Sequence, residues 1–149
     1  MKLVRKYSTG ILFLIFLFII LTVSCDSEEE ESHAKNVILM IGDGMGVSQL
    51  YAGLTSNHGE LNIAGMKYIG FHKTYSYDNY TTDSAAGGTA IATGVKTRNG
   101  IIGMSPDSLN VKSILEIVDE YGLGTGLVST SAITHATPAS FIAHQVNRA

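Results

Sequence analysis

The stretch TDSAAGGTA at residues 82–90 decides the fold prediction, because a serine there follows an aspartate and opens a run of small residues. Such a run can form a helix, whose first turn leaves backbone N–H groups unpaired and favours an anionic partner. Ser84 would lie in that turn, a setting that suits a nucleophile attacking phosphate. Many serines at such positions only cap a short helix. Both interpretations of Ser84 stay open on this stretch alone.

Upstream, the stretch IGDGMG at residues 41–46 places Asp43 just after the continuous apolar run 37–41. This run favours a strand buried on both faces, and open α/β sheets bind ligands beyond the carboxyl ends of their strands. The glycines allow a bound group to approach closely. Asp43 is therefore a candidate cation ligand, or else a cap of the next helix. The glycine spacing does not match the dinucleotide motif G-x-G-x-x-G, and the sequence contains no Walker-type loop.

The stretch THATP at residues 134–138 follows a second run that favours a buried strand, residues 126–130. Side chains at i and i+2 of an extended segment point the same way, so His135 and Thr137 could face one cation. Pro138 favours the first turn of a helix, and Thr137 could equally cap that helix. Metal ligation and capping both remain open for Thr137.

The remaining pattern alternates short apolar runs with amphipathic ones. Residues 69–71 favour a short strand, and residues 84–93 favour a helix of small side chains. Residues 111–121 carry apolar side chains at i, i+3, i+4 and i+7, which predicts a helix with Asn110 as its N-cap and Gly122 as its stop. Strands that alternate with helices predict an α/β domain with a largely parallel sheet.

The first residues have the pattern of an export signal. Residues 1–24 combine basic side chains with the apolar run 11–21, which is typical of a secretory leader and shorter than the roughly 20 residues that span a membrane. Cys25 resembles the lipidated cysteine of bacterial lipoproteins, although an ordinary cleaved leader with an incidental cysteine is the alternative. Dense acidic charge at 26–31 predicts that residues 25–35 form a disordered tether. We therefore expect an exported protein, periplasmic or on the cell surface, with a lipid in the membrane.

Four motifs in order resemble the alkaline phosphatase family: NVILMIGDGMG at 36–46, TDSAA at 82–86, TGVKT at 93–97 and ATPA at 136–139. The similarity covers residues 36–149. It implies a three-layer fold with a central, largely parallel sheet, of which only the N-terminal part is present. The family's remaining zinc ligands come from sequence beyond this chain, so the chain is predicted to be a fragment of a catalytic domain that is inactive in isolation.

The resemblance also implies roles for individual residues. Asp43 would bridge a zinc ion and a magnesium ion, and Thr137 would be a magnesium ligand. Ser84 would be the nucleophile that becomes phosphoserine and would bind the same zinc. Asp83 would orient Arg148, whose planar fork binds two phosphate oxygens.

His135 occupies a position that is aspartate in some family members and histidine in others. A nitrogen ligand is softer than a carboxylate and weakens the preference for magnesium. The implied cofactors are two zinc ions, one held mostly by residues beyond this chain, and a third site for magnesium that also admits zinc or cobalt.

The implied function is metal-dependent hydrolysis of phosphate monoesters through a phosphoserine intermediate. One alternative is another hydrolase of the superfamily, a phosphodiesterase or a sulfatase, although these typically use threonine or a modified cysteine as the nucleophile. The other is a surface-tethered phosphate-binding lipoprotein without activity. A homodimer of the full-length protein is compatible with the resemblance. The formal net charge is −3 without a basic stripe, so no nucleic acid partner is expected.

Overall fold

The computed structural model describes residues 34–149. The predicted leader at 1–24 and the lipidated Cys25 lie outside the described residues, as does most of the predicted tether at 25–35. The described residues fall in two units, which divide between Leu39 and Met40. None of the described helices is both long and apolar enough to cross a membrane.

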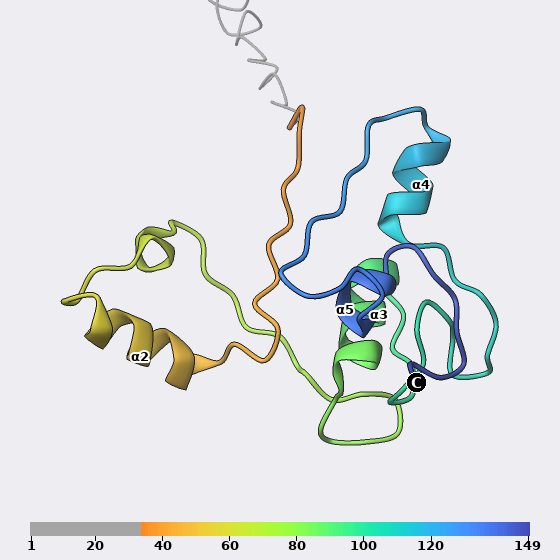
Figure 1. The fold of residues 1–149 in the computed structure, drawn as a ribbon, viewed down its shortest axis with the longest axis horizontal. Coiled ribbons are helices and arrows are strands. Elements are labelled where there is room, and N and C mark those ends of the chain that lie inside the picture. The colour runs from red at the N-terminus through yellow and green to blue at the C-terminus, as the bar shows by residue number, and fades with distance from the viewer. Residues whose placement is uncertain (1–33) are drawn as a thin grey trace, which may run out of the picture. The chain divides into compact units, whose positions relative to one another are not determined.

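The second unit contains four α-helices and one 3₁₀ helix in its described residues (Figure 1). In chain order these are α2 (Val47–Ser56), η1 (Asn62–Gly65), α3 (Ser84–Thr93), α4 (Ile114–Glu120) and α5 (Ala136–Ala139). Sequence reasoning gave no bounds for a helix after Asp43, where α2 lies, and predicted no element at η1.

Helix α3 confirms the helix predicted at residues 84–93. Its N-cap is Asp83, whose carboxylate accepts a hydrogen bond from the Ala86 N–H at 2.9 Å. Its C-cap is Gly94, in the left-handed conformation at φ 73° that glycine adopts without a Cβ penalty. The helix therefore begins and ends where its local sequence directs.

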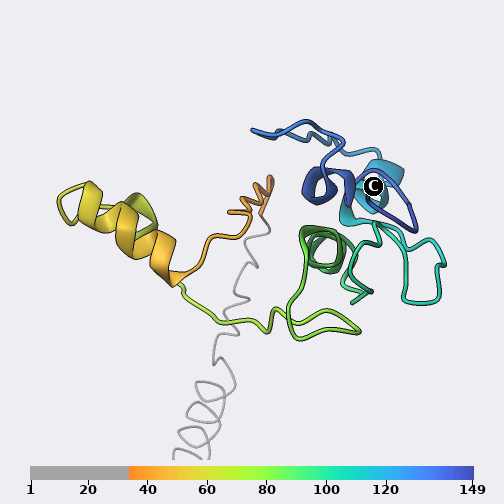
Figure 2. The same cartoon turned by 60° about the horizontal axis from the view of Figure 1, so that its bottom comes forward.

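Helix α5 packs against α3, and Figures 1 and 2 both show the two helices side by side. Small side chains permit this approach: Ala85 of α3 and Ala136 and Ala139 of α5 are buried together with Ile102. Thr89, fully buried in α3, donates to the Ile101 carbonyl at 3.3 Å and accepts from the Gly103 N–H at 2.9 Å. These two bonds tie the loop around residue 102 to the helix that begins with Ser84.

Helix α4 confirms the helix predicted at residues 111–121 in a shorter form. The predicted N-cap at Asn110 is wrong, because Ser113 caps the helix. The Ser113 hydroxyl accepts from the Glu116 N–H at 3.2 Å, and the Glu116 carboxylate accepts from the Ser113 N–H at 2.7 Å. This reciprocal capping box satisfies two otherwise unpaired donors. Gly122, at φ 73°, follows the helix as predicted.

The described residues contain no β-strand, so the strands predicted at 37–41, 69–71 and 126–130 are not formed there. Their only β-type pairings are isolated antiparallel bridges, such as the one between Ile102 and Gln145. A strand requires hydrogen bonds to a neighbouring strand, and the described residues supply no such neighbour to these runs. Their apolar side chains are exposed accordingly, with Val128 97% exposed.

Candidate active site

Ser84 is the first residue of α3, and the helix is capped by the residue before it. The structure therefore excludes the interpretation of Ser84 as the N-cap. Its side chain lies in the first turn, where backbone N–H groups have no partner within the helix. The hydroxyl is free to take part in a contact beyond its own helix.

The Asp43 carboxylate is where three predicted site residues meet. Ser84 Oγ donates to Asp43 Oδ1 at 3.2 Å, and Thr137 Oγ1 donates to Asp43 Oδ2 at 2.8 Å. The cap of α2 is Gly46, so Asp43 does not cap the helix that follows it. One carboxylate thus gathers two hydroxyls from segments that are 41 and 94 residues away in the sequence.

Thr137 lies within α5, whose N-cap is His135. The prediction that His135 and Thr137 both lie on an extended segment is therefore wrong, because only His135 has extended backbone (φ −62°, ψ 152°) and the chain is helical from Ala136. Pro138 is the third residue of the helix. His135 is exposed, and its side chain makes no capping hydrogen bond. The structure brings Thr137 to Asp43, whereas the His135 side chain makes no hydrogen bond to Asp43.

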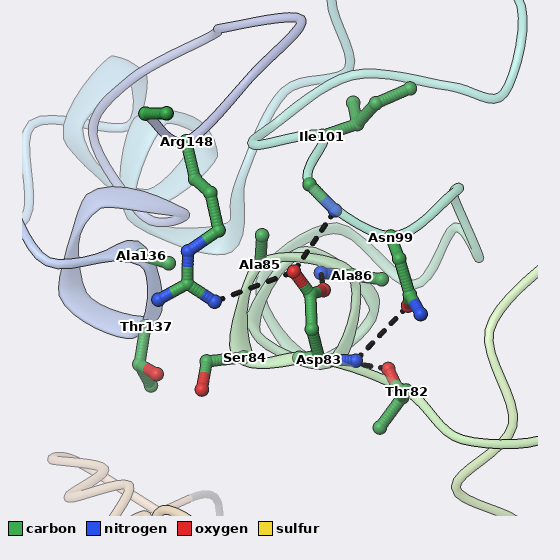
Figure 3. Close-up of polar contacts among 12 residues, drawn as sticks. Thr82, Asp83, Ser84, Ala85, Ala86, Asn99, Ile101, Ala136, Thr137 and Arg148 are labelled. Carbon is green, nitrogen blue, oxygen red and sulfur yellow. Dashed lines mark hydrogen bonds and ion pairs between the residues drawn. The ribbon is translucent and has the colours of Figure 1, made fainter.

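Arg148 reaches Asp83, the residue that it was predicted to contact. Its Nη1 lies 3.4 Å from Asp83 Oδ2, and Figure 3 shows the guanidinium directed at this carboxylate. The two side chains are 36% and 27% exposed, so solvent weakens the attraction between their charges. The contact fixes the direction of the guanidinium more than it stabilises the fold.

Asp83 is held at three further points. Oδ1 accepts from the Ala86 N–H at 2.9 Å, Oδ2 accepts from the Gly100 N–H at 3.0 Å, and the Asp83 N–H donates to Asn99 Oδ1 at 3.0 Å. Sequence reasoning missed Asn99 and Gly100. No spacing motif in the sequence links Asn99 to a residue 16 positions earlier.

A second polar cluster fastens the segment that leads to Arg148. His144 Nδ1 lies 2.6 Å from the Gly103 carbonyl, and His144 Nε2 lies 3.0 Å from Glu116 Oε1. Both partner atoms are acceptors, so both ring nitrogens can donate only when the imidazole is protonated. The neighbouring Gln145 exchanges two backbone hydrogen bonds with Ile102, at 2.9 and 2.8 Å. The charged form of His144 thus joins this segment to α4.

The pKa values of the pair follow from these contacts. Burial opposes the charge on each group. For His144, the hydrogen bonds to Gly103 and Glu116 outweigh burial and raise its pKa. For Glu116, the hydrogen bonds from Ser113 and His144 outweigh burial and lower its pKa. The pair's contribution to stability is lost as the pH rises through the folded pKa of His144, and it is lost again as the pH falls through that of Glu116.

The donor set around Asp43 is compatible with part of a cation site. Residues 34–149 contain no group of three or more His, Cys, Asp or Glu side chains placed to hold a metal. The available donors are one carboxylate and two hydroxyls, all hard oxygen ligands of the kind that magnesium prefers.

Comparison with known proteins identifies the family. The alkaline phosphatase family model matches residues 34–149, so the chain belongs to the alkaline phosphatase family. It is 44% identical over 130 residues to alkaline phosphatase 4 of Bacillus subtilis, covering 81% of this chain and 28% of that protein. It is 40% identical over 125 residues to the alkaline phosphatase of Escherichia coli, covering 77% of this chain and 26% of that protein. The chain spans about a quarter of the length of these relatives.

Solved structures give the same assignment. The alkaline phosphatase of the Antarctic bacterium TAB5 superposes with a TM-score of 0.73 at 50% identity, over 76% of this chain and 33% of that chain. The cold-active alkaline phosphatase of a Shewanella species superposes with a TM-score of 0.59 at 31% identity, over 72% and 29% of the two chains. The described fold therefore matches part of an alkaline phosphatase.

Proposed function

We propose that the complete protein containing this chain hydrolyses phosphate monoesters through a phosphoserine intermediate at Ser84. The observation that carries the proposal is the double hydrogen bond to Asp43, from Ser84 at 3.2 Å and from Thr137 at 2.8 Å. The Ser84 bond places a serine from the first turn of a helix beside a carboxylate. The residue before Ser84, Asp83, orients Arg148. Family membership supports the same reaction.

In the proposed reaction, each residue of the chain has a separate task. Arg148 binds two oxygens of the phosphoryl group through its planar fork, and Asp83 holds that fork in place. Ser84 Oγ attacks phosphorus in line as the alcohol departs on the opposite side. Water then displaces Ser84 Oγ, which releases inorganic phosphate and restores the hydroxyl.

The proposed cofactors are two zinc ions and a third ion, magnesium, zinc or cobalt. Asp43 and Ser84 would hold one zinc, and Asp43, His135 and Thr137 would contribute to the third site. The oxygen donors gathered at Asp43 support this assignment. Bound metal would acidify the serine hydroxyl and offset negative charge on the phosphoryl group. In the TAB5 enzyme, a variant with one histidine replaced by aspartate holds magnesium in its M3 site.

The unpaired apolar runs fit the same proposal. In the complete protein, we propose that residues 37–41 and 126–130 become strands of the central sheet of a three-layer fold. Their exposed side chains, with Ile38 86% and Val128 97% exposed, support this because such surface is normally buried between layers. A leader at residues 1–24, a lipid on Cys25, a disordered tether, an exported location and a homodimer remain part of the proposal.

Substrate comparison tests the reaction class. The complete protein, supplied with zinc and magnesium, is offered p-nitrophenyl phosphate, bis-p-nitrophenyl phosphate and p-nitrophenyl sulfate. The proposal predicts the highest kcat/KM for the monoester. Faster turnover of the diester or the sulfate would assign a different hydrolase activity, and absence of turnover with retained phosphate binding would indicate a binding protein. Purified residues 26–149 should show no sustained turnover, because they hold only part of the metal site.

A further inference from the structure

The side chain of Asn99 joins two backbone groups just before the nucleophile. Its Oδ1 accepts from the Asp83 N–H at 3.0 Å (Figure 3). Its Nδ2 donates to the Thr81 carbonyl at 2.9 Å. We propose that Asn99 is a positioning residue for phosphoryl transfer, which fixes Asp83 and through it both Ser84 and Arg148. This inference rests on the proposed function and adds to it a residue that touches none of the reacting atoms.

Gly100 completes the hold on Asp83. Its N–H donates to Asp83 Oδ2 at 3.0 Å, and its φ of +89° lies in the left-handed region that glycine adopts readily. Two neighbouring residues of one turn therefore hold Asp83: the Asn99 side chain binds the Asp83 backbone, and the Gly100 backbone binds the Asp83 carboxylate. The same Oδ2 faces Arg148 at 3.4 Å. A displacement of the turn would move the carboxylate that aims the guanidinium.

The turn is itself anchored from the other side. The Asn99 N–H donates to Asp78 Oδ1 at 3.3 Å, and this oxygen accepts from the hydroxyl of Ser76 at 3.1 Å. Ser76 is 3% exposed, so the chain of contacts begins at a buried point. Asn99 is exposed, which means that truncating it leaves no cavity. Asn99 therefore positions Asp83 through the two hydrogen bonds of its side chain.

Asn79 provides a matched control in the same loop. Its Oδ1 accepts from the Thr81 N–H at 2.9 Å, which is also a bond from an asparagine side chain to the backbone of residue 81. None of its hydrogen bonds in the described structure reaches Asp83. A general loosening of the loop would follow from either truncation, whereas displacement of Asp83 should follow from Asn99→Ala alone.

The kinetic test compares Asn99→Ala with Asn79→Ala in the complete protein. Loss of the two side-chain hydrogen bonds of Asn99 should raise the KM for p-nitrophenyl phosphate and the inhibition constant of inorganic phosphate together, by about fivefold to tenfold. Asn79→Ala should change each by about twofold at most. Melting temperatures of the two variants should agree. Equal kinetic effects of the two variants would overturn the inference.

Hydrogen–deuterium exchange gives a readout that does not depend on activity. In Asn99→Ala, the peptide that contains the Asp83 amide should exchange faster than in the parent and in Asn79→Ala. Unchanged exchange would contradict the hold on Asp83. In a double-mutant cycle, Asn99→Ala should add less to the phosphate inhibition constant in an Asp83→Ala background, and full additivity would contradict action through Asp83. Failure of the parent to form phosphoserine would instead refute the proposed function, and the exchange result would still decide the role of Asn99.

Discussion

Gly88 of α3 faces Thr137 and Ser140 at close range, and Gly88→Ala should push α5 away from α3. A Cβ at this position would lie 2.9 Å from Ser140 Oγ and 3.2 Å from Thr137 Cα. The second contact is with backbone, so the strain cannot be relieved by rotating one side chain. Helix α5 would have to shift, and with it the Thr137 hydroxyl that donates to Asp43 at 2.8 Å.

The expected change in the unfolding free energy of Gly88→Ala is the sum of two opposing effects. Alanine is favoured over glycine inside a helix by about 0.5–1 kcal/mol. Overpacking a close contact costs about 1–3 kcal/mol. Gly87→Ala is the matched control, because its Cβ would lie at ordinary contact distances of 3.5 and 3.6 Å from atoms of Thr82. The helix preference is common to both variants, so their difference in unfolding free energy isolates the overpacking term of about 1–3 kcal/mol.

Urea unfolding of the complete protein measures this difference. Gly87→Ala should unfold at or above the parent's midpoint and Gly88→Ala below it, with equal dependence on urea concentration. Gly88→Ala should also require more added magnesium for half-maximal activity, because Thr137 is displaced. A Gly88→Ala protein as stable as Gly87→Ala would refute the close packing of the two helices and the argument built on it.

Three further changes give separate tests. The parent should lose stability as the pH rises through the folded pKa of His144, and His144→Gln should remove this loss. Urea midpoints measured across neutral pH check the prediction. A parent whose stability does not fall through that range would contradict the charged pair with Glu116. His135→Asp in the complete protein should tighten magnesium binding, because a carboxylate restores an oxygen ligand and a negative charge. Activity titrated with magnesium after chelation measures it, and an unchanged curve would remove His135 from the third site. Cys25→Ala should move the protein from the membrane fraction to the soluble fraction, and a variant that stays in the detergent phase would point to anchoring by the leader.

Local features of the sequence were enough to predict the helix that carries the nucleophile. The small residues of 84–93, the aspartate before them and Gly94 after them all act within one or two turns, so α3 was predicted with its observed bounds. The start of α4 was misplaced because Asn110 and Ser113, three positions apart, both have side chains that can cap a helix. Asn110 was chosen, whereas the pairing of Ser113 with Glu116 decided the matter.

Contacts between segments that are far apart in the sequence were harder to predict. The meeting of Asp43 with Ser84 and Thr137 was implied by family resemblance alone, because the three residues are far apart in the sequence. No sequence motif identified Asn99, because its partner Asp83 lies 16 residues away and many turns contain an asparagine. The predicted strands failed to form among the described residues because an apolar run specifies burial and does not supply the neighbouring strand that it pairs with.

The most direct test of the central claim is the chemical identity of the phosphorylated residue. The complete protein is incubated with labelled inorganic phosphate at acidic pH, quenched, digested and mapped by mass spectrometry. The account predicts one labelled site, at Ser84, and no label in Ser84→Ala under the same conditions. Label on another residue, or label that survives the substitution, would contradict the assignment of Ser84 as the nucleophile.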